Sequence, residues 1–71
     1  MPRFPQLTAR QFLRVLERAG FAEAHRTGSH RTLKHPDGRW LVFAFHEREQ
    51  IGPKMVARVA KRAGLSQDDF S

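Results

Sequence analysis

The sequence contains no cysteine. This absence excludes a disulfide framework, a thiol nucleophile and a thiolate metal site, and it fits a protein that works in a reducing compartment. Long apolar runs are also absent, since no stretch approaches the roughly 18 apolar residues that a membrane span requires. Residues 1–5 lack the apolar segment of an export signal. We therefore expect a soluble, unexported cytoplasmic protein that does not span a membrane.

Acidic side chains are few. The 7 Asp and Glu residues stand against 13 Lys and Arg, for a formal net charge of +6, and Asp68 and Asp69 lie close to the C-terminus. Ten of the basic residues are arginines, whose planar guanidinium group suits phosphate. A positive surface of this kind favours a polyanionic partner, such as nucleic acid, an anionic membrane or an acidic protein. Genome composition alone can also produce a high arginine content.

With 71 residues the chain has room for a single domain with one small core. Thr8 is a good helix cap, and apolar residues recur at helical spacing from there until Gly20. A second helix is predicted from Pro53 to Gly64, because proline suits the first turn and glycine the end of a helix. The second helix carries a stripe of basic residues on its polar face: Lys54, Arg58, Lys61 and Arg62.

Three strands are predicted between the helices, over residues 21–26, 30–34 and 39–45. The sequence His35-Pro36-Asp37-Gly38 predicts a tight hairpin turn between the last two. The third strand is apolar on both of its faces, which is typical of a strand at the centre of a sheet or of a face covered by helices. After the second helix, residues 66–70 can form one more turn that docks Phe70 on the core.

The resulting order is α-β-β-β-α. We expect an α+β fold, with a three-stranded antiparallel sheet and two helices on one face, which resembles the double-stranded-RNA-binding domain.

The hairpin turn sets which strand residues lie opposite one another. His35 should face Arg39, Leu33 should face Leu41, and His30 should face Ala44, and opposite residues share a face of the sheet. The core face then holds Leu33, Leu41, Phe43 and Phe45. The other face holds His30, Thr32, Lys34, Trp40 and His46, with His46 diagonal to His30. Two imidazoles beside a lysine and an indole suit RNA, because imidazole moves protons near neutral pH and a base can stack on tryptophan. On the alternative interpretation these are ordinary surface residues.

Several short motifs resemble, in order and spacing, those of the HicA family of messenger-RNA interferases. They are Ala19-Gly20-Phe21, Gly28-Ser29-His30, His35-Pro36-Asp37-Gly38, the strand end at His46, Ile51-Gly52-Pro53 and Ala63-Gly64-Leu65-Ser66. The resemblance implies one HicA-like domain over residues 1–71. It also implies a type II toxin that cleaves messenger RNA and is neutralised by a HicB-type antitoxin protein, with His30 as the catalytic residue.

Chemistry consistent with that resemblance needs no cofactor, because the ribose 2′-hydroxyl supplies the nucleophile. We expect His30 to act as general acid or base, with His46 as a possible second proton carrier. The residues expected to bind RNA are Arg26, Gly28, Ser29, Arg31, Lys34, Arg39, Trp40 and Lys54. No metal site is expected, since the four histidines lack the paired spacing of metal ligands.

Three other functions remain open on the sequence alone. The same scaffold could bind double-stranded RNA without cutting it. The basic second helix could belong to a DNA-binding regulator, although it lacks the Asn and Gln residues that read bases. A basic interaction domain for an acidic protein is the third possibility.

Overall fold

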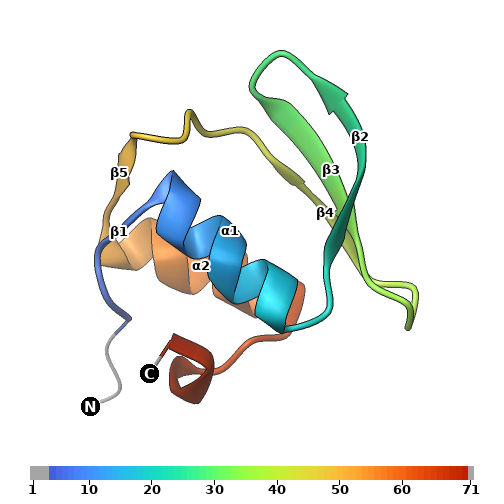
Figure 1. Ribbon diagram of the computed structural model, residues 1–71. Coiled ribbons are helices and arrows are strands. Elements are labelled where there is room, and N and C mark those ends of the chain that lie inside the picture. Colours follow the sequence, from blue (N-terminus) through green and yellow to red (C-terminus); the bar gives the residue numbers. More distant parts are fainter. Residues whose placement is uncertain (1–3, 71) are drawn as a thin grey trace.

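The computed structural model describes residues 4–70. Residues 1–3, part of the segment in which we expect no export signal, and residue 71 lie outside this range. The elements follow the predicted order, with two short strands and a final 3-10 turn around them (Figure 1). Their bounds are β1 (Leu7–Thr8), α1 (Ala9–Arg18), β2 (Ala22–Thr27), β3 (His30–Lys34), β4 (Trp40–Phe43), β5 (Gln50–Ile51), α2 (Pro53–Ala63) and η1 (Gln67–Phe70).

Both helices begin and end at the predicted signals. The Thr8 hydroxyl accepts a hydrogen bond from the Gln11 backbone N–H at 3.2 Å, and the Gln11 side chain accepts one from the Thr8 N–H at 3.0 Å. This reciprocal capping satisfies amide donors that the first turn of α1 would otherwise leave free. Pro53 is the first residue of α2, and Gly64 ends it with a φ of 73°. The left-handed conformation at Gly64 strains any residue that carries a β-carbon.

Strands β2, β3 and β4 form an antiparallel sheet in that order, which confirms the predicted three-stranded sheet. The register between β3 and β4 is also the predicted one over the pairs Thr32–Val42, Leu33–Leu41 and Lys34–Trp40. In the connecting turn the His35 N–H donates to the Arg39 carbonyl at 2.8 Å, and the Gly38 N–H donates to the His35 carbonyl at 2.9 Å. The hairpin is therefore built as the Pro-Asp-Gly pattern predicts.

Of the two interpretations of the third strand, the face covered by helices is confirmed and the central position in the sheet is wrong. Strand β4 lies at an edge of the sheet, because β3 is the strand that pairs on both sides. It also covers only Trp40–Phe43 rather than residues 39–45. Trp40 and Val42, on the face opposite to the core, are 57% and 51% exposed. The continuous apolar run thus reflects one covered face and one open apolar face, not burial on both sides.

The core lies between the helices and one face of the sheet. Phe12 of α1 is fully buried and makes edge-to-face ring contacts with Phe43 of β4 and Phe70 of η1, at centroid distances of 5.7 and 5.5 Å. The Phe70 contact confirms the predicted docking of the C-terminal turn. Buried residues of both helices join Leu33, Leu41 and Phe43 in one cluster. Since these three share a face, both helices cover the same side of the sheet, as Figure 1 shows.

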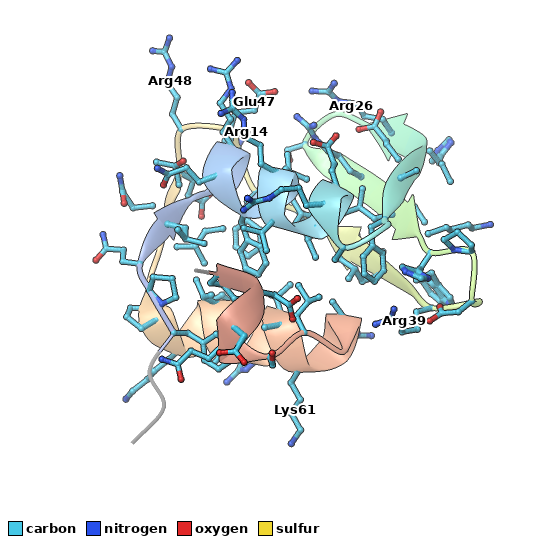
Figure 2. The ribbon with its side chains drawn as sticks, turned by 60° about the horizontal axis from the view of Figure 1, so that its bottom comes forward. Arg14, Arg26, Arg39, Glu47, Arg48 and Lys61 are labelled. Atoms are coloured by element: carbon cyan, nitrogen blue, oxygen red, sulfur yellow. The ribbon has the colours of Figure 1, made fainter. Side chains whose placement is uncertain are left out.

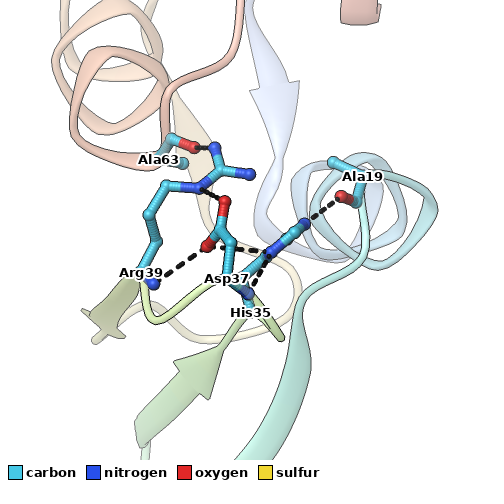
Figure 3. Close-up of polar contacts among 5 residues, drawn as sticks. All are labelled: Ala19, His35, Asp37, Arg39 and Ala63. Atoms are coloured by element: carbon cyan, nitrogen blue, oxygen red, sulfur yellow. Dashed lines mark hydrogen bonds and ion pairs between the residues drawn. The ribbon is translucent and has the colours of Figure 1, made fainter.

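A polar latch ties the β3–β4 hairpin to the ends of both helices (Figure 3). The His35 Nε2 donates to the Ala19 carbonyl at 3.0 Å, and its Nδ1 accepts from the Asp37 N–H at 3.1 Å. The Arg39 Nε donates to the Asp37 carboxylate at 2.7 Å, while its Nη1 donates to the Ala63 carbonyl. The backbone N–H of Arg39, 3.0 Å from the Asp37 carboxylate, holds the pKa of Asp37 below its ordinary value of 3.8. We call His35, Asp37 and Arg39 the hairpin latch.

Candidate active site

His30 lies at the tip of the β2–β3 hairpin. A two-residue turn of Gly28 and Ser29 joins the strands, and His30 is the partner of Thr27 in the pair that closes the turn. The His30 side chain is exposed, and its ring has no hydrogen bond or ion pair to any part of residues 4–70. An uncovered imidazole at a hairpin tip is free to approach a ligand from solvent.

The face of the sheet that carries His30 is not covered by any element within the described range. Alternation along β3 puts Thr32 and Lys34 on the same face as His30, and cross-strand pairing adds Val42 and Trp40. This confirms the predicted grouping of Thr32, Lys34 and Trp40. We call this surface the open face.

A second histidine shares the open face, and the sequence analysis did not assign it a role. Strand β2 has a register shift between Glu23 and His25, so that His25 pairs with Thr32. His25 therefore points to the same side as Thr32 and His30, and it is diagonal to His30, a position about 7 to 8 Å away in a regular ladder. Its Nε2 lies 3.0 Å from the Thr27 hydroxyl. The extra residue, Ala24, reverses the alternation and brings His25 to this face.

His46 lies in different surroundings from those we expected. The β3–β4 ladder ends at the pair Arg31–Phe43, so the predicted pair of His30 with Ala44 does not extend it. Beyond β4 the alternation that placed His46 on the open face no longer applies. His46 instead lines a pocket of about 350 Å³ between the β2–β3 tip and the segment after β4. We call it the tip pocket; its other lining residues are Arg26, Gly28, Ser29, Arg31, Phe45 and Glu47.

Arg31 turns away from the open face. It pairs with Phe43, a core residue, and its side chain is only 12% exposed. Its Nη2 donates to the Glu47 carboxylate at 3.0 Å, and its Nη1 lies 3.6 Å from the carboxylate of Glu23. The hydrogen bond and the positive charge of Arg31 hold the pKa of Glu47 below its ordinary value of 4.5, with smaller contributions from Arg10 and Arg26.

The predicted RNA-binding residues thus fall into separate groups. Arg26, Gly28, Ser29 and Arg31 meet at the tip pocket, while Lys34 and Trp40 lie on the open face. Arg39 belongs to the hairpin latch, where it contacts Asp37 and the end of α2.

Lys54 lies at the start of α2 beside a different pocket, lined also by Gly52, Pro53, Met55 and Arg58. Figure 2 shows Arg26 and Glu47 along one edge of the molecule, and Arg39 and Lys61 away from it.

Within residues 4–70 no three His, Asp or Glu side chains are grouped closely enough to hold a metal ion. No helix in the same range has the length and apolar character needed to cross a membrane.

Comparison with known proteins gives the chain its family. The family model described as the HicA toxin of bacterial toxin-antitoxin systems matches residues 9–65, which is more than half of the chain. A search of curated proteins found no match. The matched range runs from the first residue of α1 to just past the end of α2, and so includes His30 and the whole sheet. The chain belongs to the HicA family of toxins from bacterial toxin-antitoxin systems.

Proposed function

We propose that this toxin is a metal-independent endoribonuclease that cleaves messenger RNA with His30 as general acid or base. The observation that carries the proposal is the exposed His30 ring at the hairpin tip, without a partner in residues 4–70. A ring in that position can exchange a proton with a bound ribose. Membership of a toxin family supports a destructive activity, and the basic surface supports an anionic substrate.

The proposed reaction uses the ribose 2′-hydroxyl as the nucleophile. A base takes the 2′-proton while the 2′-oxygen attacks the adjacent phosphorus, the bond from phosphorus to the 5′-oxygen breaks, and an acid protonates that oxygen. The products are a 2′,3′-cyclic phosphate and a 5′-hydroxyl end. A positioned imidazole contributes roughly 10²- to 10⁴-fold to such a proton transfer. Lys34, on the same face as His30, stabilises charge on the phosphate, and Trp40 stacks on a base.

The second proton carrier in this scheme is His25 rather than His46. His25 shares the open face with His30, whereas His46 lines the tip pocket together with arginines. The two assignments make different predictions, because His25→Ala should slow cleavage and change its pH profile by removing one of the two proton carriers. His46→Ala should change RNA affinity more than the pH profile.

The protein that neutralises this toxin is, in our proposal, a HicB-type antitoxin that covers the open face. Trp40 and Val42 present an exposed apolar area that another protein can bury. Trp40 is the only tryptophan of the chain, so its fluorescence reports directly on this contact. Adding the antitoxin should shift that fluorescence and stop cleavage at the same molar ratio.

The experiment that tests the proposed chemistry examines the ends of the products. Purified protein is incubated with a mixed-sequence RNA in excess chelator, and the products are analysed for cyclic phosphate and for 5′-hydroxyl ends. A matched RNA with 2′-O-methyl groups throughout should remain intact, because it lacks the nucleophile. Cleavage of the methylated RNA, or products with 5′-phosphate ends, would overturn the mechanism. A non-catalytic module for double-stranded RNA would bind both substrates and cut neither.

A further inference from the structure

The tip pocket holds positive charge that the proposed chemistry at His30 does not use. Arg26 and Arg31 line it, and Arg10 is close enough to affect the ionisation of Glu47. The charges of three arginines therefore act on one carboxylate, and within residues 4–70 the only other acid in contact with Arg31 is Glu23. The pocket lies on the helix-facing side of the hairpin tip, since Arg26 pairs with Arg31 and Arg31 pairs with core residue Phe43.

The guanidinium of Arg31 is only partly satisfied by its acidic partners. Glu47 accepts a hydrogen bond from Nη2 at 3.0 Å, and Glu23 lies 3.6 Å from Nη1. The Nε–H, on the same edge of the guanidinium as Nη2, is buried and has no hydrogen-bond partner among residues 4–70. Phosphate oxygens bind this edge in a bidentate manner, so that both N–H groups are used. Glu47 occupies half of a site that a phosphate group would fill.

Backbone hydrogen bonds hold Glu47 and its neighbours in place, so that only the Glu47 side chain can move away from Arg31. The Arg10 N–H donates to the Glu47 carbonyl at 3.1 Å, and the Glu49 N–H donates to the His46 carbonyl at 2.9 Å. The Glu47 side chain is 50% exposed, so its carboxylate is solvated by water when it turns away from Arg31. Releasing it would open the Arg31 edge without moving the pocket wall.

The surface of the β2–β3 turn leaves space for a polyanion to lie across it. Within residues 4–70, a β-carbon built on Gly28 would meet no atom within 4 Å, and the hydroxyl of Ser29 beside it has no hydrogen-bond partner. The next residue is His30, on the other side of the tip. A strand that crosses Gly28 and Ser29 would therefore run from the arginines to the proposed catalytic histidine.

We propose that the tip pocket binds a phosphodiester group of an RNA strand through Arg31, Arg26 and Ser29, and that Glu47 occupies Arg31 as an internal anion until RNA displaces it. This inference rests on RNA being the substrate, as proposed above. It assigns to Glu47 a restraining role, because every binding event must first break its contact with Arg31.

The test compares two variants that each remove one carboxylate. Glu47→Gln keeps the size of the side chain but weakens its hold on Arg31. Glu17→Gln is the matched control, since Glu17 is exposed on α1, has no ion pair in residues 4–70 and lies outside the tip pocket. Affinity is measured by fluorescence anisotropy with a labelled 2′-O-methyl RNA oligonucleotide that cannot be cleaved. Thermal melting checks that both variants are folded.

The expected result is that Glu47→Gln binds the oligonucleotide roughly 3- to 10-fold more tightly than wild type, as expected when a charge-assisted contact no longer competes. Glu17→Gln should change the affinity by less than about twofold, because exposed charges are screened. The slope of log affinity against log salt should become steeper by about 0.7 in Glu47→Gln alone. In this variant one more positive charge of the protein is available to neutralise a phosphate. Inorganic phosphate should compete with the oligonucleotide more effectively for Glu47→Gln than for the control.

Equal affinities and equal salt slopes for the two variants would overturn the proposal. Competition by inorganic phosphate without any gain for the oligonucleotide would also overturn it, because the pocket would then hold a free anion and not an RNA strand. The measurement does not depend on cleavage. If unmodified RNA stays intact while the two variants differ as expected, the nuclease function fails and the phosphate site stands; if RNA is cut and the variants bind alike, only the phosphate site fails.

Discussion

Replacing Gly64 with alanine should destabilise the fold for two separable reasons. The φ of 73° at Gly64 places the residue in the left-handed region, where a β-carbon costs about 1 to 2 kcal/mol. A β-carbon there would also lie 2.5 Å from the Arg39 Nη1, the atom that donates to the Ala63 carbonyl. The guanidinium would have to move and lose that hydrogen bond. Because the Arg39 side chain is 37% exposed, we expect this loss to cost about 1 to 2 kcal/mol, toward the lower end for a charged donor.

Gly28→Ala separates the two costs. Gly28 has a φ of 60°, but a β-carbon there meets nothing within 4 Å, so this variant carries the backbone strain alone. Gly64→Ala should therefore be less stable than Gly28→Ala by about 1 to 2 kcal/mol, which corresponds to a Tm lower by roughly 5 to 15 °C in a domain of this size. Thermal and urea unfolding, followed by far-UV circular dichroism and by Trp40 fluorescence, measure both quantities.

A double-mutant cycle identifies the cause. When Arg39 is replaced by alanine in both backgrounds, the contact that distinguishes the two glycines is gone, and the two alanine substitutions should then cost the same. Equal stability of Gly64→Ala and Gly28→Ala with Arg39 present, or a difference that persists in the Arg39→Ala background, would show that the Arg39 contact is not the cause.

Three further predictions concern the core, the open face and the latch. Phe12→Ala should lower the free energy of unfolding by about 3 to 5 kcal/mol, which is about the total stability that a core this small supplies. Circular dichroism should then show most molecules unfolded at 37 °C. Val42→Ala, at an exposed site, should stay folded. Trp40→Ala should weaken binding of a 2′-O-methyl RNA by about 1 to 3 kcal/mol in an anisotropy titration, through loss of base stacking, with an unchanged Tm; unchanged affinity would remove Trp40 from the RNA surface. The folded pKa of Asp37 lies below its unfolded value near 3.8, so its contribution to stability is present above that value and is lost as pH falls through the folded pKa. Wild type should therefore lose more stability than Asp37→Asn when Tm is measured from pH 4 downward, and parallel pH curves would contradict this.

Local signals in the sequence predicted much of the fold. Thr8, Pro53 and Gly64 act at the positions they occupy in the chain, because capping and left-handed termination depend on neighbouring residues. The turn before Arg39 fixed the register between β3 and β4 for the same reason. The same register places Arg31 opposite core residue Phe43, although we expected Arg31 only as one of the RNA-binding residues.

The features that sequence reasoning missed depend on contacts between distant segments. The bulge at Ala24 has no glycine to mark it, yet it decides which face His25 joins. The pairing of β1 with β5 joins segments of two residues, which are too short to show a period. The edge position of β4 and the place of His46 depend on where pairing stops, which alternation alone does not specify.

The most direct measurement compares the rate of RNA cleavage by wild type and by His30→Ala at saturating RNA in excess chelator, with the affinity of each for a 2′-O-methyl RNA measured alongside. We expect the variant to lose roughly 10²- to 10⁴-fold in cleavage rate, to keep its affinity within about twofold, and to melt at the same temperature, because His30 is exposed and acts only in proton transfer. An equal rate of cleavage by the two proteins, or the absence of any cleavage by wild type, would contradict the catalytic role of His30.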